Sequence, residues 1–282
     1  MKFELYFERR GLEAFFLPPL AISLSLKSFT EADMKAIILA AGLGKRLHPL
    51  TVNRPKCLVD FGGKAILDHQ IDAMLAVDVE EFVIVVGYEA DQVKAHCAKK
   101  LQQQQQRGGV RFVANSDFDK TNSLYSLSLA AHELDGDVFL LNCDIVFDPR
   151  IAHRLTDIEC PNVIAVDSQA SRPLGEMCVK LSSDNHVEAI SKQLNPGTSD
   201  ALSAQVARFC GAGARSLSAE IARLSTAGGE ALFPTSAYGP LIEARQMFGV
   251  DVGDLAWAEI DSLHDYEQAL EITLPGMVVS SS

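Results

Sequence analysis

Short apolar runs alternate with amphipathic segments through the first half of the chain, from Met34 onward. The runs are typical of buried strands and occupy residues 36–40, 82–86, 110–114 and 138–142. The segments predicted to be helices occupy residues 65–76, 89–106 and 123–134. This alternation of strand and helix indicates a parallel sheet with helices on both of its faces.

The pattern changes after Asp148, where strand-like segments follow one another closely. They are residues 162–168, 177–183 and 186–194, with a turn predicted at 184–185. The elements predicted after them are a strand near 205–210, helices near 216–226 and 236–248, a short strand carrying Glu259 and Asp261, and a helix from Ser262. We therefore predict an α/β fold with a mixed, mainly parallel sheet, helices on both faces and a small antiparallel addition.

No linker rich in Gly, Ser or Pro divides the part after Met34, so residues 34–282 are predicted to form a single domain. Residues 1–33 contain a short apolar stretch after two arginines, but Glu13 and two prolines interrupt it and no small-x-small cleavage site follows. The stretch is too short to span a membrane. We expect residues 1–33 to be an upstream extension, disordered or non-native, rather than an export signal.

The net charge of −12 argues against a nucleic-acid partner and against an anionic membrane surface. An anionic ligand would need a local basic site that works against this overall charge. The cysteines show no C-x-x-C pair and no zinc-binding spacing, which favours reduced thiols in a cytoplasmic protein. They are Cys57, Cys97, Cys143, Cys160, Cys178 and Cys210.

The loop after the first predicted strand has the composition of a phosphate-binding loop. Gly42 and Gly44 leave the backbone N–H groups accessible, Arg46 can make a forked contact with phosphate oxygens, and Lys56 adds a second cation. In open α/β sheets ligands bind beyond the carboxyl ends of the strands, where this loop lies. The spacing matches neither the dinucleotide fingerprint nor the P-loop, and a tight turn with surface basic residues is the structural alternative.

Two carboxylates follow short apolar strands far apart in the sequence. Asp144 follows residues 138–142 and Cys143, and Asp261 follows the last predicted strand. Asp148 and Ser262 are the better helix caps, which leaves both carboxylates available for a ligand. Mg²⁺ prefers one or two carboxylates together with phosphate oxygens, so Asp144 and Asp261 are predicted as its ligands.

Together these motifs resemble the sugar-1-phosphate nucleotidyltransferase superfamily. The stretch from Leu39 to Leu58 matches its pattern L-A-A-G-x-G-x-R-x-x-P-L-T-x-x-x-P-K-x-L. Within that superfamily, the segments "NSDFDKTNSLYSLSLA" (115–130) and "EIDSLHDYEQA" (259–269) resemble the choline-phosphate and 2-aminoethylphosphonate cytidylyltransferases. The resemblance implies a Rossmann-like fold of GT-A type, Mg²⁺ dependence, CTP as donor and pyrophosphate as leaving group.

The resemblance also implies roles for individual residues. The catalytic set would be Arg46, Lys56, Asp144 and Asp261, of which the two aspartates would bind the metal. The nucleotide would be bound by a larger set: Ala40, Ala41, Gly42, Gly44, Arg46, Asn115, Thr121, Asn122 and Ser123.

The acceptor site is less defined by the sequence. Lys180, Lys192 and Glu176 are its candidates, and Gln205 stands where the family often has a glutamate. The expected acceptor is phosphocholine or 2-aminoethylphosphonate. Two alternatives stay open at this point: a sugar-1-phosphate nucleotidyltransferase that uses UTP, dTTP or GTP, and an inactive nucleotide-sensing subunit. An oligomeric state is possible and is not indicated by any residue pattern.

Overall fold

The apolar runs of the sequence pair into a large β-sheet in the computed structural model, which describes residues 34–103 and 109–277. These residues belong to one compact unit, Ala32–Ser282. The predicted extension at residues 1–33 lies outside the described residues, as does the end of the helix predicted over 89–106. The start of the domain therefore stays a prediction. Among the described helices, none combines the length and apolar character needed to cross a membrane.

One half of the sheet is parallel. Its strands are β1 (Lys35–Ala40), β4 (Glu81–Val86), β5 (Val110–Ala114) and β6 (Val138–Asn142). β1 lies in the middle, paired with β4 on one side and β6 on the other, and β5 pairs with β4. Every residue of β1 is buried, as expected of an apolar run without alternation.

The other half of the sheet is mostly antiparallel. Its strands are β8 (Asn162–Asp167), β9 (Cys178–Leu181), β10 (Val187–Ser191), β11 (Ala201–Phe209) and β12 (Phe248–Asp251). β11 joins the halves, because it runs antiparallel to β6 and also pairs with β8 and β9. Its register against β8 shifts between Ser203 and Ala207, and Gln205 within this bulge has a φ of 56°.

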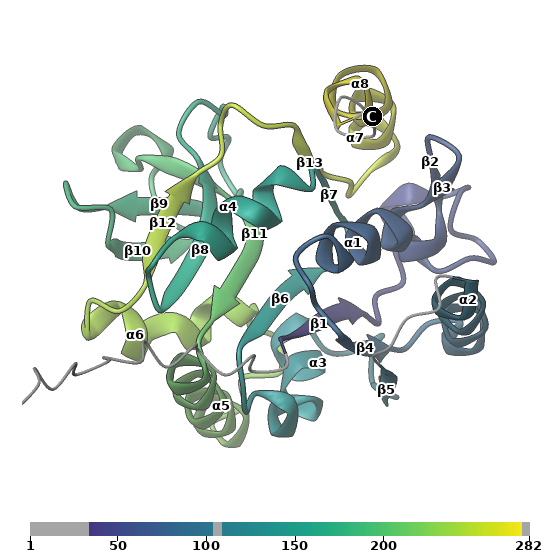
Figure 1. Cartoon of the computed structure of the whole chain (residues 1–282), viewed down its shortest axis with the longest axis horizontal. Coiled ribbons are helices and arrows are strands. Elements are labelled where there is room, and N and C mark those ends of the chain that lie inside the picture. The colour runs from purple at the N-terminus through teal and green to yellow at the C-terminus, as the bar shows by residue number, and fades with distance from the viewer. Residues whose placement is uncertain (1–33, 104–108, 278–282) are drawn as a thin grey trace, which may run out of the picture. The chain divides into compact units, whose positions relative to one another are not determined.

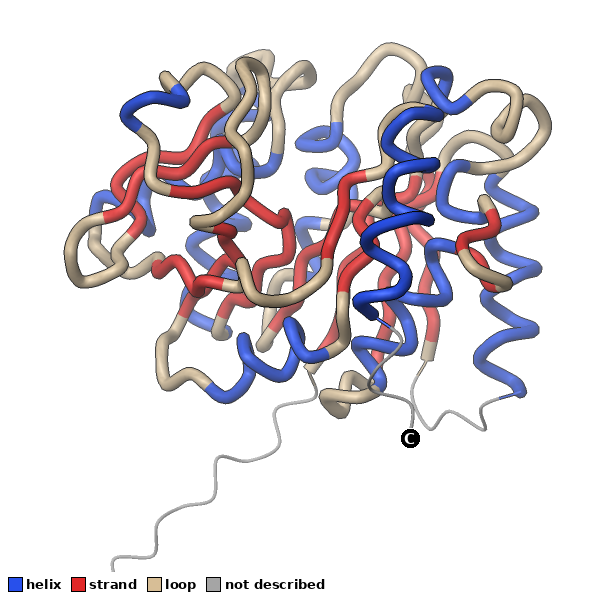
Figure 2. The backbone as a smooth tube through the Cα atoms, turned by 90° about the horizontal axis from the view of Figure 1, so that it is seen from above, coloured by secondary structure: helices blue, strands red, loops and turns tan. Residues whose placement is uncertain are grey.

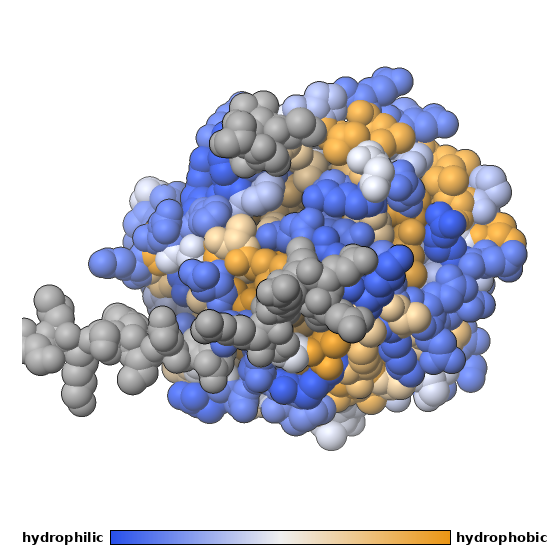
Figure 3. Space-filling view, turned by 45° about the vertical axis from the view of Figure 1, so that its right-hand side comes forward, coloured by the Kyte–Doolittle hydropathy of each residue, from blue (hydrophilic) through white to orange (hydrophobic). Residues whose placement is uncertain are grey.

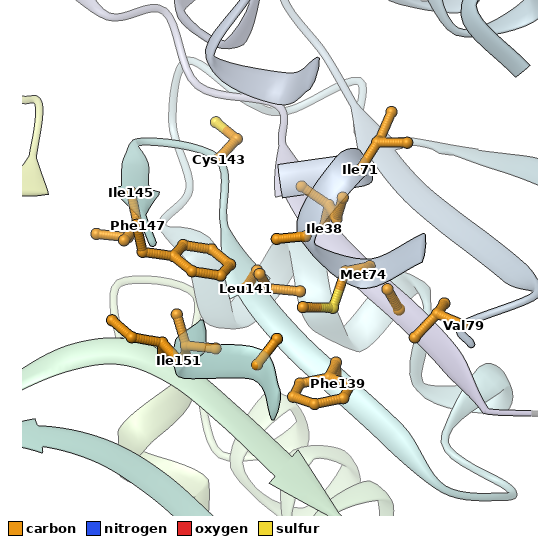
Figure 4. Packing of buried hydrophobic residues seen from close by; sticks show 14 of the residues in the cluster. Ile38, Ile71, Met74, Val79, Phe139, Leu141, Cys143, Ile145, Phe147 and Ile151 are labelled. Atoms are coloured by element: carbon orange, nitrogen blue, oxygen red, sulfur yellow. The ribbon is translucent and has the colours of Figure 1, made fainter. Parts of the chain in front are cut away.

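Helices cover both faces of the sheet (Figure 1). On one face lie α1 (Ile66–Leu75), α2 (Ala90–Gln103) and α4 (Arg150–Asp157). On the other lie α3 (Ser123–Leu129), α5 (Gly211–Thr226) and α6 (Gly239–Glu243). Figure 2 shows the strands running side by side between these helices. The two cores follow the strand alternation, since Ile38 packs with Ile71 and Met74 on one face and Ile37 packs on the other (Figure 4).

A third, smaller core lies beyond the carboxyl end of β6. Two pairs of short strands contribute to it: the hairpin of β2 (Asp60–Phe61) and β3 (Lys64–Ala65), and the pair of β7 (Ile145–Phe147) and β13 (Trp257–Glu259). The helices α7 (Leu263–Gln268) and α8 (Leu274–Met277) complete it and are joined by a π-helical turn at Ala269–Thr273. Leu47, Phe61, Val146 and Ile260 are buried there. This core fixes the position of the chain on both sides of β13.

The fold class predicted from the sequence is confirmed: an α/β fold has a mixed sheet with helices on both faces, a parallel half and antiparallel strands added at one side. The turn predicted at 184–185 is also present, with Asn185 at a φ of 63° between β9 and β10. All six cysteines are free thiols. The face drawn in Figure 3 is largely hydrophilic, with several hydrophobic patches between the hydrophilic residues.

Three predicted elements have different bounds in the structure. The helix predicted over 236–248 is present only in its first half, as a 3-10 turn at Pro234–Tyr238 followed by α6. Its second half is wrong, since α6 ends at Glu243, Arg245 takes a φ of 53°, and Phe248 begins β12 beside β8. The helix predicted over 123–134 ends at Leu129 and a 3-10 turn follows. The strand predicted near 205–210 begins earlier, at Ala201.

An ionic network at the amino end of β1 gives a test of stability. Glu133 accepts hydrogen bonds from Arg111 Nε (3.0 Å) and Nη2 (2.8 Å), and Lys35 Nζ lies 3.4 Å from it. Burial acts to raise the pKa of Glu133, but Arg111 outweighs it and the pKa is lowered. We expect Glu133→Gln to reduce the free energy of unfolding by about 1–3 kcal/mol near neutral pH.

Because the folded pKa of Glu133 is below its unfolded value, its contribution is complete above the unfolded pKa and is lost as the pH falls through the folded value. The difference between wild type and variant in urea unfolding should therefore shrink from about pH 6 to about pH 3. Glu188→Gln is the control, since its ion pair with Lys180 is exposed and should contribute little. A pH-independent difference would contradict this account.

Candidate functional site

A short antiparallel ladder brings together carboxylates that are far apart in the sequence. β13 pairs with β7 so that Glu259 faces Ile145, and the Ile260 N–H donates to the carbonyl of Asp144 at 2.8 Å. Asp144 and Asp261 therefore lie next to each other at the carboxyl end of β6. Glu259 joins them, because residues 259 and 261 are two apart and share a side of the extended chain.

Lys56 lies between the aspartates. Its ammonium is 2.9 Å from Asp144 Oδ2 and 2.6 Å from Asp261 Oδ1, and its side chain is only 8% exposed. Arg46 donates to the other oxygen of Asp261 at 2.7 Å, but 72% of its side chain is exposed. Lys56 is thus a fixed internal cation, whereas Arg46 can exchange its partner for a ligand.

The acidic cluster has the donor set of a divalent-cation site. Asp144, Glu259 and Asp261 each offer one oxygen, and these oxygens lie within 4.8 Å of one another. Asp144 Oδ1 is buried and has no hydrogen-bond donor among the described residues. A buried carboxylate oxygen without a donor is costly unless a cation occupies its free side. Three carboxylate oxygens suit Mg²⁺, so the residues present fit the metal predicted from the sequence.

The cluster also perturbs the pKa values of its members. Burial and the nearby charges of Asp144 and Asp261 raise the pKa of Glu259 to about 7. Burial acts to raise the pKa of Asp261, but the charges of Lys56, Arg46 and Lys192 outweigh this effect, so its pKa is lowered. Burial acts to lower the pKa of Lys56, yet the two aspartates raise it well above its ordinary value. Lys56 is accordingly a permanent cation near neutral pH.

The cluster forms one wall of a cavity of about 420 Å³, and the glycine-rich loop forms another. Gly44 has a φ of 61°, and a Cβ there would lie 2.9 Å from Lys56 Cβ, so glycine is required for the loop to pack on that lysine. Thr51 closes the loop by donating to the Gly44 carbonyl at 2.8 Å. Gly42 faces open space, which leaves its backbone accessible to a ligand.

Most of the predicted nucleotide-binding residues lie at this cavity. The predicted residues that line it are Ala41, Gly42, Gly44, Arg46, Thr121, Asn122 and Ser123. Ala40 is buried within β1 and does not line it. Asn115 is also buried, and it supports the loop by bonding Thr121 Oγ1 at 3.2 Å and Ser126 Oγ at 3.0 Å. Its place is behind the cavity wall, not on it.

The three acceptor candidates separate in the structure. Lys192 lines the cavity, 5.3 Å from the centroid of the Phe233 ring. Lys180 lies on β9, where its ammonium is 3.3 Å from exposed Glu188, and it does not line the cavity. Glu176 is half-buried in the loop before β9 and does not line the cavity either. The structure therefore brings only Lys192 of the three to the acidic cluster.

Sequence reasoning missed several residues of the cavity. Glu259 was recognised as part of a strand but not as a ligand, although its spacing of two from Asp261 was a usable signal. Gln205 was noted only as a departure from the family, yet its Nε2 donates to Glu259 at 2.6 Å and its Oε1 accepts from Asn142 at 2.6 Å. Nothing in the sequence indicates that Phe233 lines the cavity, because a single aromatic residue in a loop forms no recognisable sequence pattern.

The position of Lys56 generates a prediction about metal binding. Lys56→Met should lower the melting temperature by several degrees without metal, because two close carboxylates lose their shared cation. The same change removes a competitor for the carboxylates, so Mg²⁺ should stabilise the variant more than it stabilises wild type. Thermal unfolding with and without Mg²⁺ measures both effects. Lys94→Met, on the exposed side of α2, is the control, and equal Mg²⁺ responses in all three proteins would refute the prediction.

Known proteins resemble this chain in sequence and in fold. The CMP-5'-(3-aminopropyl)phosphonate synthase of Streptomyces rubellomurinus is 30% identical over 254 residues, which cover 86% of this chain and 40% of that protein. The N-acetylmuramate alpha-1-phosphate uridylyltransferase of Caulobacter vibrioides is 38% identical over 122 residues, covering 42% of this chain and 48% of that protein. The matched region is thus less than half the length of either relative.

The structure of the CTP:phosphocholine cytidylyltransferase of Streptococcus pneumoniae superposes with a TM-score of 0.68 at 25% identity, over 85% of this chain and 99% of that one. Residues 36–234 match the MobA-like NTP transferase domain. This match contains the glycine-rich loop, Lys56 and Asp144, and the superfamily identified from the sequence is confirmed. The chain belongs to the MobA-like NTP transferase domain family.

Proposed function

We propose that this protein is a Mg²⁺-dependent cytidylyltransferase that joins CMP from CTP to a small phosphate or phosphonate, such as phosphocholine or 2-aminoethylphosphonate. The observation that carries the proposal is the cluster of Asp144, Glu259 and Asp261 around Lys56, at the edge of a cavity bordered by a glycine-rich loop. Relatives whose names specify CMP or CTP support the cytidine nucleotide.

The nucleotide would lie along the glycine-rich loop. The backbone of Gly42 faces the cavity without a side chain, so its N–H can approach a phosphate oxygen. Arg46 is exposed enough to turn from Asp261 to the leaving phosphates and hold them with its fork. Thr121, Asn122 and Ser123 would contact the nucleoside from the opposite wall.

The reaction is an in-line displacement at phosphorus. An acceptor oxygen, already anionic near neutral pH, forms a bond to the α-phosphorus of CTP while the bond from that phosphorus to the β-phosphate bridging oxygen breaks. Pyrophosphate leaves with the electron pair of that bond, so no proton transfer is required. Lys56 and Lys192 hold negative charge at the reacting end, and alignment and charge neutralisation supply the catalysis.

Asp144, Glu259 and Asp261 would hold the Mg²⁺. When bound, it would supply Lewis-acid neutralisation of phosphate charge and a fixed point for orienting the phosphates. Lys56 keeps two of these carboxylates in place before any substrate arrives.

A sugar-1-phosphate nucleotidyltransferase that uses UTP is the second candidate, favoured by the match to a uridylyltransferase. It would share the loop, Lys56 and the acidic cluster, so only the nucleobase and the acceptor separate the two functions. An inactive nucleotide-sensing subunit is less favoured, because the cationic and acidic residues of the site are all present. A cytoplasmic location and an oligomeric state stay predictions.

The substrates can be identified by pyrophosphate release. CTP, UTP, dTTP, GTP and ATP are each combined with phosphocholine, 2-aminoethylphosphonate or glucose-1-phosphate in Mg²⁺ buffer. We expect turnover with CTP and an amino-alkyl acceptor, and turnover with glucose-1-phosphate would favour the second candidate. Asp144→Asn and Asp261→Asn should each reduce kcat by about 10²-fold or more, whereas Asp91→Asn on α2 should not. Unchanged rates in both site variants would remove their proposed roles.

Lys192 and Lys180 allow a matched test of the acceptor site. Lys192→Met should raise the KM for the acceptor about tenfold or more, because a charge-assisted contact in the cavity is lost. Lys180→Met removes the same charge from a strand outside the cavity and should leave that KM unchanged. Initial rates at saturating CTP measure both, and equal effects of the two changes would contradict the assignment.

A further inference from the structure

Gln205 connects the acidic cluster to the central part of the sheet. Its Nε2 donates to Glu259 Oε2 at 2.6 Å, and its Oε1 accepts a hydrogen bond from Asn142 Nδ2 at 2.6 Å. An ionised carboxylate can only accept hydrogen bonds, so the nitrogen of the Gln205 amide faces Glu259 and the oxygen faces Asn142. The side chain of Gln205 is thus held at both of its polar ends.

The residue that holds the far side of the Gln205 amide is itself fixed. Asn142 ends β6, where it pairs with Leu39 of β1. Its carbonyl also accepts a hydrogen bond of 2.7 Å from Nε2 of Gln70, a fully buried residue of α1. A donor on a central strand therefore sets the orientation of the Gln205 amide before any ligand arrives.

The backbone of Gln205 is also in an uncommon conformation for a residue with a side chain. Its φ of 56° lies in the left-handed region, at the point where the register of β11 against β8 shifts. The Gln205 N–H donates to Ser203 Oγ at 3.0 Å within the same strand. Such a conformation costs free energy and is found mainly at functional sites. Here it accompanies a side chain that lines the cavity.

Glu259 is left with one oxygen for a metal ion. Its Oε2 accepts the short hydrogen bond from Gln205, whereas its Oε1 accepts none from the described residues. An ion that bound both oxygens would displace the Gln205 amide and leave a donor without its partner, which is costly away from bulk water. The contact with Gln205 thus favours binding through a single oxygen of Glu259.

We propose that Gln205 is a positioning residue that makes Glu259 a one-oxygen ligand and thereby selects Mg²⁺ over Ca²⁺ at the acidic cluster. The proposal rests on the metal site of the function proposed above. Mg²⁺ is small and binds few carboxylate oxygens in a strict octahedron, whereas Ca²⁺ takes more oxygens and often both oxygens of one carboxylate. The amide of Gln205 is also neutral, so it orients Glu259 without adding charge to the cluster that Lys56 stabilises.

Ion binding without nucleotide tests this role. Gln205→Met keeps the length of the side chain and removes the donor. The full chain is titrated with MgCl₂ or with CaCl₂, and the rise of the melting temperature with concentration gives a Kd for each ion. We expect the variant to bind Mg²⁺ about tenfold more weakly than wild type, and Ca²⁺ no more weakly, because both oxygens of Glu259 become available. Gln268→Met, at an exposed position on α7, is the matched control.

A second variant tests the same contact from its other side. Asn142→Ala leaves Gln205 in place but removes the donor that orients its amide. The ratio of the Ca²⁺ Kd to the Mg²⁺ Kd should therefore fall in this variant too, by less than in Gln205→Met. An unchanged ratio in Gln205→Met would overturn the proposal, even if both ions bind more weakly. If Gln205→Met does not fold, a lower ratio in Asn142→Ala supports the proposal and an unchanged one overturns it.

The result is independent of the pyrophosphate assay. A lower ratio supports the role of Gln205 even where no pair of nucleotide and acceptor gives turnover, in which case only the proposed function fails. Turnover with CTP together with an unchanged ratio would keep that function and remove the role of Gln205. If neither ion raises the melting temperature of wild type, the proposal on ion selection fails, and pyrophosphate release still tests the function by itself.

Discussion

Mutual repulsion among Asp144, Glu259 and Asp261 is the constraint around which the site is built. Their oxygens lie within 4.8 Å of one another, a distance at which carboxylates cannot all stay ionised without a nearby cation. Lys56 supplies that cation from inside the protein, held by Gly44 and the loop that packs on it. The glycine-rich loop therefore shapes the cavity and also fixes the charge that lets the acidic cluster exist.

Much of the fold could be predicted from the sequence, because buried parallel strands are continuous apolar runs and their helices have a clear period. The structure of the region after Glu243 could not be predicted in this way. Leu241, Ile242 and Met247 continue a helix-like spacing, but the chain turns at Arg245 and Phe248 pairs with β8 instead. The local spacing predicts a helix there, but pairing with the distant strand β8 determines the structure.

The site was predictable to a similar degree. The long glycine-rich motif identified Arg46 and Lys56, the end of an apolar strand identified Asp144, and the structure places each of them at the cavity. The meeting of Asp144 with Asp261 depends on β7 and β13, two strands of three residues whose pairing no local pattern reveals. The contact between Gln205 and Glu259 could not be predicted either, because Gln205 lies in a bulge set by the register of β11 against β8.

Strand β6 lies where the parallel and the antiparallel halves of the sheet meet. This strand has a parallel neighbour, β1, that leads to the glycine-rich loop, and an antiparallel neighbour, β11, that carries Gln205 at the cavity. Under the proposed function, the donor and the acceptor would therefore be bound by separate halves of the sheet that meet along one strand. With such an arrangement, changes in the antiparallel half would alter the acceptor while the nucleotide and the chemistry stayed the same.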